Sequence, residues 1–220
     1  MEKHLEEIQS RLQKVPKYTE KVSKLRGTKL FYPADEIKLK YSTNIISKIL
    51  SLGKIKSSYD FGCGTGIYVQ ELINYGINSL GFDANLGIKK ELKTKEENIM
   101  YTNLEYFSSK DYIPRDLVLS IEFVEHLSKK GGDLFCNYAT QLSKNWIVMT
   151  ASNKPGEFHS NPQPKDYWIT RIEEKKTHKY KKQLTNDFME FFHNLILTKH
   201  GLNWFRKDLM IFKNIKERRL

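Results

Sequence analysis

The chain has 220 residues, of which 39% are hydrophobic and 12% aromatic, so it can form one globular domain with a substantial core. No stretch approaches the roughly 18 consecutive apolar residues of a membrane-spanning helix, and the first residues lack the apolar segment of a secretory signal, so we expect neither. The only cysteines are Cys63 and Cys136, which excludes a disulfide scaffold or a four-thiolate zinc site and favours a reducing, cytoplasmic compartment.

The net charge of +11 is spread unevenly along the chain. Residues 1–50 carry a net +5, residues 51–170 a net −1 and residues 171–220 a net +7. A neutral centre with basic ends suits a protein whose ends face an anionic partner. The alternative is that a lysine-rich surface simply keeps the protein in solution.

Helical periodicity dominates the N-terminal quarter. Apolar residues recur at helical spacing near the start, at Leu5, Ile8, Leu12 and Val15. This segment is either a small coiled-coil contact or a helix lying on the domain surface. A second helical pattern runs from Ile37 to Leu50 and is ended by Gly53. We therefore expect a helical extension over residues 1–52, packed on a core domain formed by residues 53–220.

From residue 58 onward, short apolar runs alternate with helical patterns. The expected strands are 58–61, 79–83, 99–101, 116–120 and 146–150, and the expected helices are 68–75, a lysine-rich segment after residue 83, and 131–142. Such alternation predicts an α/β fold built on a parallel sheet. Towards the end, a helix over 184–197 is followed by a predicted antiparallel hairpin of Trp204-Phe205 and Met210–Phe212.

A glycine-rich loop follows the first expected strand, with the sequence Asp60-Phe61-Gly62-Cys63-Gly64-Thr65-Gly66. Glycine allows a tight turn and close approach of a ligand to the backbone, and the helix that follows offers unpaired amides. The spacing differs from the dinucleotide pattern G-x-G-x-x-G. Asp83, at the end of the next strand, can accept hydrogen bonds from both hydroxyls of a ribose. The alternatives are another kind of nucleotide-binding protein, or a glycine turn without a ligand.

Over roughly residues 55–150, these features resemble the class I S-adenosylmethionine-dependent methyltransferases. The resemblance implies a Rossmann-like, seven-stranded, mostly parallel sheet with helices on both faces. It implies that the loop wraps the methionine part of S-adenosylmethionine, that Asp83 holds the ribose, and that Asn103 and Leu104 line the adenine. The cofactor-binding residues expected on this basis are Asp60, Gly62, Cys63, Gly64, Gly66, Asp83, Asn103, Leu104 and Ser120.

A second group of candidate residues, Glu122, Glu125 and His126, follows the strand expected over 116–120. On a helix these positions would share one face, just beyond the carboxyl end of a central strand, where α/β sheets bind ligands. Two carboxylates and an imidazole suit Mg²⁺ or Mn²⁺. His159, in the loop after the next strand, is a fourth candidate ligand.

The sequence E-x-x-E-H is similar to the metal site of the small-RNA 3′-terminal 2′-O-methyltransferases and to a segment of the ubiquinone-pathway O-methyltransferases. The resemblance implies catalytic roles for Glu122, His126 and His159. The alternative is that no metal binds, because many methyltransferases carry a Glu-His pair here that lines the cofactor or supplies a histidine base.

The segment from Ser152 to Trp168 combines polar side chains with aromatic rings, as carbohydrate-binding sites do. It resembles the H-x-N-x-P-x-x-Y-W segment of small sugar- and glycan-modifying methyltransferases of bacteria and large DNA viruses. This implies substrate contacts by Asn161, Tyr167 and Trp168, and the cytoplasm of an infected host as a further possible location. The alternative is a structural lid in which Trp168 anchors the next helix in the core.

The leading hypothesis is a metal-assisted O-methyltransferase acting on a sugar hydroxyl of a glycan. An RNA ribose 2′-O-methyltransferase is the alternative, although residues 171–182 hold only one aromatic residue, Tyr180, among their basic residues. A non-catalytic, methyltransferase-like binding subunit is the third possibility, and the intact glycine loop argues against it. The sequence does not specify an oligomeric state.

Overall fold

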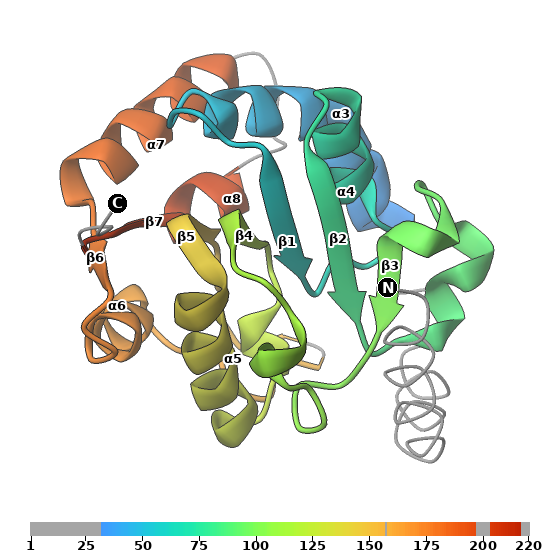
Figure 1. The fold of residues 1–220 in the computed structure, drawn as a ribbon. Helices are drawn as coiled ribbons and strands as arrows, with labels where there is room; N and C mark the ends of the chain where they lie inside the picture. The colour runs from blue at the N-terminus through green and yellow to red at the C-terminus, as the bar shows by residue number, and fades with distance from the viewer. Residues whose placement is uncertain (1–31, 157, 197–202, 217–220) are drawn as a thin grey trace.

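The computed structural model describes residues 32–156, 158–196 and 203–216. The helix predicted around Leu5–Val15 lies outside this part of the chain. The described residues form a seven-stranded sheet in the order β3-β2-β1-β4-β5-β7-β6 (Figure 1). The strands are β1 (Ser57–Phe61), β2 (Asn78–Asp83), β3 (Ile99–Tyr101), β4 (Arg115–Ser120), β5 (Ser143–Met149), β6 (His178–Tyr180) and β7 (Met210–Asn214).

The first five strands pair in parallel, while β7 pairs antiparallel with both β5 and β6. The predicted α/β class and the mostly parallel Rossmann-like sheet are thereby confirmed. Strand β4 is buried from Leu117 to Ser120, as expected for a central parallel strand covered on both faces.

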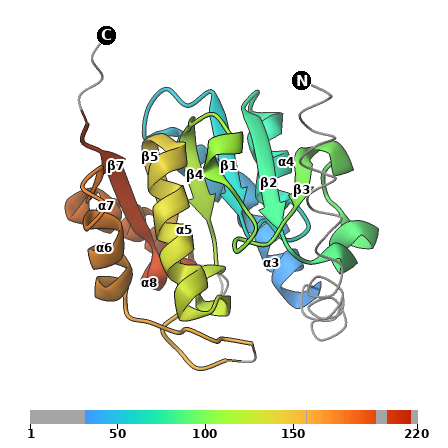
Figure 2. The ribbon, with the colours of Figure 1, turned by 60° about the horizontal axis from the view of Figure 1, so that its bottom comes forward.

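Helices cover both faces of the sheet (Figures 1 and 2). The helices are α3 (Tyr32–Leu50), α4 (Ile67–Asn74), α5 (Lys129–Leu142), α6 (Lys165–Glu173), α7 (Lys182–Ile196) and α8 (Asn203–Asp208). The described part of the chain also contains four short 3₁₀ turns, η2 (Leu86–Glu91), η3 (Glu96–Asn98), η4 (Ser109–Asp111) and η5 (Val124–His126). Among the described residues, no helix combines the length and apolar character required to cross a bilayer.

The core has two main layers, one on each face. Helices α3, α4, α7 and α8 pack on one face, where Ile45 and Phe192 are fully buried. Helices α5 and α6 pack on the other, which is rich in aromatic residues such as Phe61 and Phe135. Because α3 contributes Ile45 to the same layer as α4, α3 packs directly on this face of the sheet.

Two predicted elements differ from the structure. The lysine-rich segment after β2 is the 3₁₀ turn η2, which begins where the Asn85 side chain accepts a hydrogen bond from Gly87 N. The predicted closing hairpin is wrong: Phe205 lies on the short helix α8, and β7 inserts between β5 and β6. Strand β6 was not predicted because its residues, His178-Lys179-Tyr180, include no aliphatic residue, unlike the equally short Ile99–Tyr101.

In this topology the ends of the parallel strands form a carboxyl edge of the sheet, and their beginnings form an amino edge. Phe61, Asp83, Ser120 and Met149 end parallel strands, so the loops that follow them meet at the carboxyl edge. Ligands of open α/β sheets bind at that edge. The predicted site residues from Asp60 to His126 lie at the ends of β1, β2, β3 and β4 or in the loops beyond them, so the fold places them on the expected side of the sheet.

Candidate active site

The glycine loop lies at the carboxyl end of β1, between this strand and α4. Gly62, Gly64 and Gly66 have φ angles of 74°, 53° and 81°, in the left-handed region that favours glycine. At Gly62 a Cβ atom would lie 2.2 Å from the ring of Phe123, so a larger residue would collide with that ring. The loop is anchored by Phe82, whose carbonyl accepts the Gly62 and Cys63 amides at 2.8 and 3.2 Å.

Asp83 lies directly beside this loop. Its Oδ2 accepts a hydrogen bond from Gly64 N at 2.9 Å, and its Oδ1 accepts one from Asn85 N at 2.8 Å. The structure therefore brings together the glycine loop and the carboxylate that the sequence singled out separately. These two amides hold the carboxylate in a fixed orientation at the end of β2.

Tyr101 is a further residue of this site, and the sequence analysis missed it. It ends β3 and lies opposite Asp83 in the strand register. Its hydroxyl is buried and has no hydrogen-bond partner among the described residues, so it can bind a ligand. Burial raises the pKa of Tyr101 to about 12, and the neighbouring charges of Glu96, Cys63 and Asp83 add to that increase. Its position at the end of an expected strand was the one feature of the sequence that could have indicated this role.

The remaining predicted cofactor residues differ in burial. Asp60 and Ser120 are buried, and the Ser120 hydroxyl has no hydrogen-bond partner within the described ranges. Asn103 is half-buried, and its Oδ1 accepts the Glu105 amide at 2.9 Å. The Leu104 side chain is only 5% exposed and packs in the core.

A candidate metal-binding cluster lies at the same edge. Glu125, His126 and His159 each offer a ligand atom, and these atoms all lie within 4.8 Å of one another. The two imidazole rings are 4.8 Å apart, edge to face. Nδ1 of His126 lies 3.1 Å from the carbonyl of Phe158, and Nδ1 of His159 lies 2.8 Å from that of Lys154. A neutral imidazole donates Nδ1–H to such a carbonyl, so Nε2 carries the lone pair that can bind a metal.

Glu125 is the unusual member of this cluster. Its side chain is fully buried, and neither carboxylate oxygen makes a hydrogen bond of good geometry within the described structure. Burial, and then the neighbouring Glu122, raise its pKa to about 8, although the backbone amides of Glu125 and Ser152 oppose this increase. A divalent cation would compensate the charge of this carboxylate.

The predicted helical geometry of the E-x-x-E-H segment is wrong. Val124–His126 is a single 3₁₀ turn, and Glu122 before it has a φ of 51°. The chain is held in this turn by the hydroxyl of Thr150, which accepts the Glu122 amide at 2.9 Å, and by the packing of Phe123 against Gly62. Glu122 influences Glu125 electrostatically but is not part of the group of three ligand atoms.

His159 comes from the loop between β5 and α6, which runs along the lower edge in Figure 2. The loop is attached to the E-x-x-E-H segment through its backbone, since Asn161 N donates to the Glu125 carbonyl at 2.9 Å. Gly156 lies against the His159 ring, where a Cβ would approach to 2.9 Å. Tertiary contacts therefore join residues that are more than thirty positions apart in the chain.

The three predicted substrate residues differ in exposure. Asn161 is 4% exposed, and its Oδ1 accepts a hydrogen bond from Gln163 Nε2 at 3.0 Å. Tyr167 is half-buried, and the Arg171 guanidinium lies over its ring, 5.0 Å from the centroid. Trp168 is fully buried in the core between α5 and α6, where its ring leaves no space for a Cβ at Gly132. The expectation that Trp168 stacks on a substrate ring is therefore wrong, because the ring is needed for helix packing.

No protein-family model matches the chain, and no curated protein sequence matches it. Solved structures do show the same fold. The magnesium protoporphyrin IX methyltransferase of Synechocystis PCC 6803, solved with bound S-adenosylhomocysteine, is 13% identical and has a TM-score of 0.60, over 89% of this chain and 98% of its own.

Two further structures support this likeness. A S-adenosylmethionine-dependent methyltransferase from Archaeoglobus fulgidus is 17% identical, with a TM-score of 0.55 over 90% of this chain and 99% of its own. The methyltransferase domain of bacterial CtHen1-C is 17% identical, with a TM-score of 0.51 over 66% of this chain and 87% of its own. At such identities the likeness concerns the fold. The chain therefore has the Rossmann-like fold of the S-adenosylmethionine-dependent methyltransferases.

Proposed function

We propose that this protein is an S-adenosylmethionine-dependent O-methyltransferase, assisted by a divalent metal, that acts on a sugar hydroxyl of a glycan. The observation that carries the proposal is the cluster of Glu125, His126 and His159 at the same sheet edge as the glycine loop. The two parts are in contact, because Phe123, within the E-x-x-E-H segment, packs against Gly62.

The residues present fit S-adenosylmethionine, which supplies a methyl group on a positively charged sulfur. The loop with its positive φ angles lets a ligand approach the backbone, and Asp83 offers a carboxylate to the ribose hydroxyls. The buried hydroxyls of Ser120 and Tyr101, which have no partner among the described residues, are further groups for polar contacts. The proposed contacts of Asp60, Cys63, Asn103 and Leu104 follow from the resemblance described above.

The donor set also fits a divalent metal. Two imidazoles and one buried carboxylate suit Mn²⁺ better than Mg²⁺, because Mg²⁺ prefers oxygen ligands. A cation there would lower the pKa of a hydroxyl that binds to it. Glu122 acts on this site through Glu125, whose pKa it raises. Without a metal, His126 or His159 would take the hydroxyl proton as a general base.

The proposed reaction transfers a methyl group from the sulfur of S-adenosylmethionine to an oxygen of the acceptor. The bond between the methyl carbon and sulfur breaks as the bond between that carbon and the acceptor oxygen forms, and the hydroxyl proton leaves to a base. The products are a methyl ether and S-adenosylhomocysteine. The task of the protein is to align the acceptor oxygen and to assist removal of its proton.

A sugar with two adjacent hydroxyls is the proposed acceptor, because a metal site favours a chelating diol over an isolated alcohol. Nδ2 of Asn161 has no hydrogen-bond partner among the described residues, and Tyr167 offers a hydroxyl and a ring, so both residues are proposed to bind such a sugar. The 3′-terminal ribose of an RNA has the same diol, and the net charge of +7 on residues 171–220 favours this second candidate.

The proposal is tested by offering methyl-free glycosides and short RNAs to the protein with S-adenosylmethionine and Mn²⁺, and measuring methyl transfer by mass. We expect EDTA to stop turnover and Mn²⁺ to restore it. His159→Ala should lose activity, whereas His193→Ala, an exposed histidine on α7, should not. Unchanged turnover after exhaustive chelation would remove the metal from the mechanism.

Salt separates the two acceptors. Methylation of a neutral glycoside should vary little with ionic strength, whereas binding of single-stranded RNA weakens with a slope of roughly 0.7 per neutralised phosphate. Efficient methylation of an RNA 3′ end that falls steeply with salt would establish the RNA candidate instead.

A further inference from the structure

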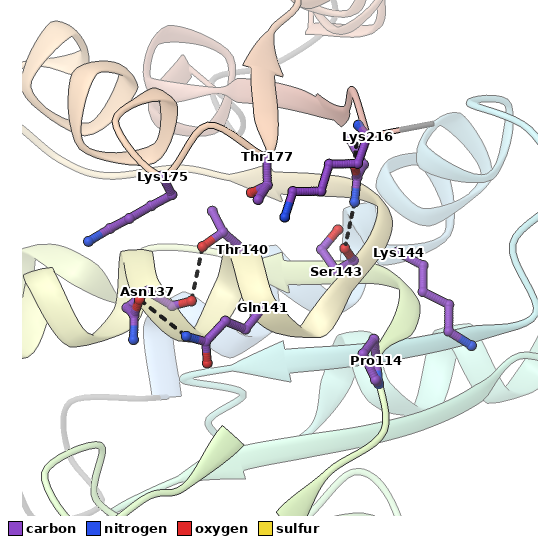
Figure 3. A pocket seen from close by; sticks show the side chains of 10 residues that line it. Pro114, Asn137, Thr140, Gln141, Ser143, Lys144, Lys175, Thr177 and Lys216 are labelled. Atoms are coloured by element: carbon purple, nitrogen blue, oxygen red, sulfur yellow. Dashed lines mark hydrogen bonds between the residues drawn. The ribbon is translucent and has the colours of Figure 1, made fainter. Parts of the chain in front are cut away.

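A cavity of about 580 Å³ lies at the amino edge of the sheet, opposite the candidate active site (Figure 3). It opens where β4 and β5 begin, beside the last turns of α5, the turn after α6 and the end of β7. Its volume lies in the range of small-molecule sites. It is lined by Pro114, Asn137, Thr140, Gln141, Ser143, Lys144, Lys175, Thr177, Asn214 and Lys216.

The residues that line the cavity carry positive charges and no negative charge. Lys144, Lys175 and Lys216 line the cavity, and no acidic residue does. Among the described residues, none of the three lysines forms a salt bridge. Three ammonium groups around one concave surface repel one another, so a bound anion would relieve this repulsion.

Two carboxylates on the adjoining helices form ion pairs with residues outside the cavity. Asp133 of α5 pairs with Arg171 at 3.0 Å, and Glu173 of α6 pairs with Lys179 at 3.1 Å. These two carboxylates therefore have cationic partners of their own, and neither of them lines the cavity.

A chain of three hydrogen bonds runs through Ser143, His178 and Thr177 beside the cavity. Oγ of Ser143 donates to the Trp146 carbonyl at 2.9 Å, so it accepts from Nε2–H of His178 at 3.1 Å. Nδ1 of His178 then accepts the hydroxyl proton of Thr177 at 2.9 Å. Burial, and then Lys216, lower the pKa of His178 to about 4, so the imidazole is neutral near pH 7 and adds no charge. Ser143 and Thr177, two of the three hydroxyl residues of the lining, are thus held in place.

The lining also indicates how a ligand is recognised. It contains lysines, hydroxyls and amides but no aromatic residue, so it offers no platform for stacking a base or a sugar ring. Lysine binds phosphate as a point charge, and the side-chain amides of Asn137 and Asn214 add N–H donors. We propose that this cavity is a phosphate-binding site, separate from the active site, that takes the phosphate groups of phosphate-ester ligands.

The two sites lie on opposite edges of the sheet. A strand of six residues spans about 20 Å, so one small molecule could not occupy both. The phosphates therefore come either from a second, small phosphorylated ligand or from a polymer with a phosphodiester backbone that crosses the sheet. The proposal goes beyond methyl transfer and holds whichever acceptor is methylated.

The test uses direct binding to the full chain, by calorimetry, of tripolyphosphate and of a short single-stranded oligouridylate, at low and moderate salt. In the cavity variant Lys144, Lys175 and Lys216 are all changed to Gln. All three are exposed, so the variant should fold. We expect its affinity to fall at least about tenfold, with a shallower salt dependence.

The control variant removes the same charge elsewhere, with Lys90→Gln, Lys182→Gln and Lys207→Gln at exposed positions outside the cavity. It should bind within about twofold of the wild type, since net charge alone has a weak effect at moderate salt. Equal weakening by both triple variants, or no binding of either ligand, would overturn the proposal.

Backbone NMR locates the site independently of affinity. We expect titration with tripolyphosphate to shift the amide signals of Thr177 and Lys144, and to leave those of Gly64 and His126 unchanged. Tripolyphosphate binding without oligouridylate binding would assign the site to small phosphorylated ligands. Binding of both, with the oligonucleotide the tighter, would assign it to a strand. Shifts confined to the glycine loop would refute the site.

Discussion

Replacing Glu125 by Gln is expected to stabilise the metal-free protein near neutral pH. The pKa of this buried carboxyl is raised from 4.5 to about 8 in the folded chain. Between those values the folded protein keeps a proton that the unfolded chain has released, so the free energy of unfolding falls as the pH rises. At pH 7 this loss amounts to about 3 kcal/mol. Glu125→Gln removes the ionisation, so its advantage over the wild type should be small near pH 4.5 and grow to about 3 kcal/mol at pH 7.

The assay is denaturant unfolding at several pH values, with and without Mn²⁺. The wild type should gain about 2.7 kcal/mol when free Mn²⁺ is a hundredfold above its dissociation constant, and Glu125→Gln should gain far less. Because the carboxyl must lose its proton to bind the metal, wild-type Mn²⁺ affinity should rise about tenfold per pH unit below pH 8. The control is Glu190→Gln, an exposed glutamate on α7. The reasoning is refuted if Glu125→Gln keeps the wild-type pH dependence, or if Mn²⁺ stabilises both proteins equally.

Three further substitutions test the rest of the site. Gly62→Ala should weaken S-adenosylmethionine binding at least about tenfold by calorimetry, because its Cβ meets a ring at 2.2 Å, whereas Gly76→Ala, with a φ of 75° and no atom within 4 Å, should leave binding intact. Asp83→Asn should weaken cofactor binding without loss of the fold, as followed by calorimetry and circular dichroism; unchanged affinity would contradict its assigned role. Trp168→Ala should lower the free energy of unfolding by about 3–5 kcal/mol, since the ring is fully buried; a variant as stable as the wild type would contradict the core assignment.

Local patterns in the sequence were sufficient for the alternation of strands and helices. Apolar runs such as Leu117–Leu119, and the glycines at 62, 64 and 66, reflect constraints that act within a few residues. The parallel sheet then places the ends of β1, β2 and β4 at one edge, so the loop and Asp83 could be expected to meet there. These expectations hold because the side-chain period and backbone sterics are local.

Other features depended on contacts between distant segments. Tyr101 belongs to the site only because β3 pairs with β2, and His159 reaches His126 only because the loop after β5 is attached to the carbonyl of Glu125. The 3₁₀ turn after β4 forms around the hydroxyl of Thr150, the residue after β5. Local sequence therefore could not predict that this turn differs from an α-helix.

The location of individual side chains, in the core or at a site, was likewise decided by packing. The same aromatic pair, Tyr167 and Trp168, was compatible with a substrate platform or with a core anchor, and the contact of Trp168 with Gly132 on α5 selects the core. Lys144, Lys175 and Lys216 are far apart in the chain and have no local pattern, yet one cavity collects them. Their grouping depends on where β5 begins and where α6 and β7 end, which is set by the long-range packing of the sheet and its helices.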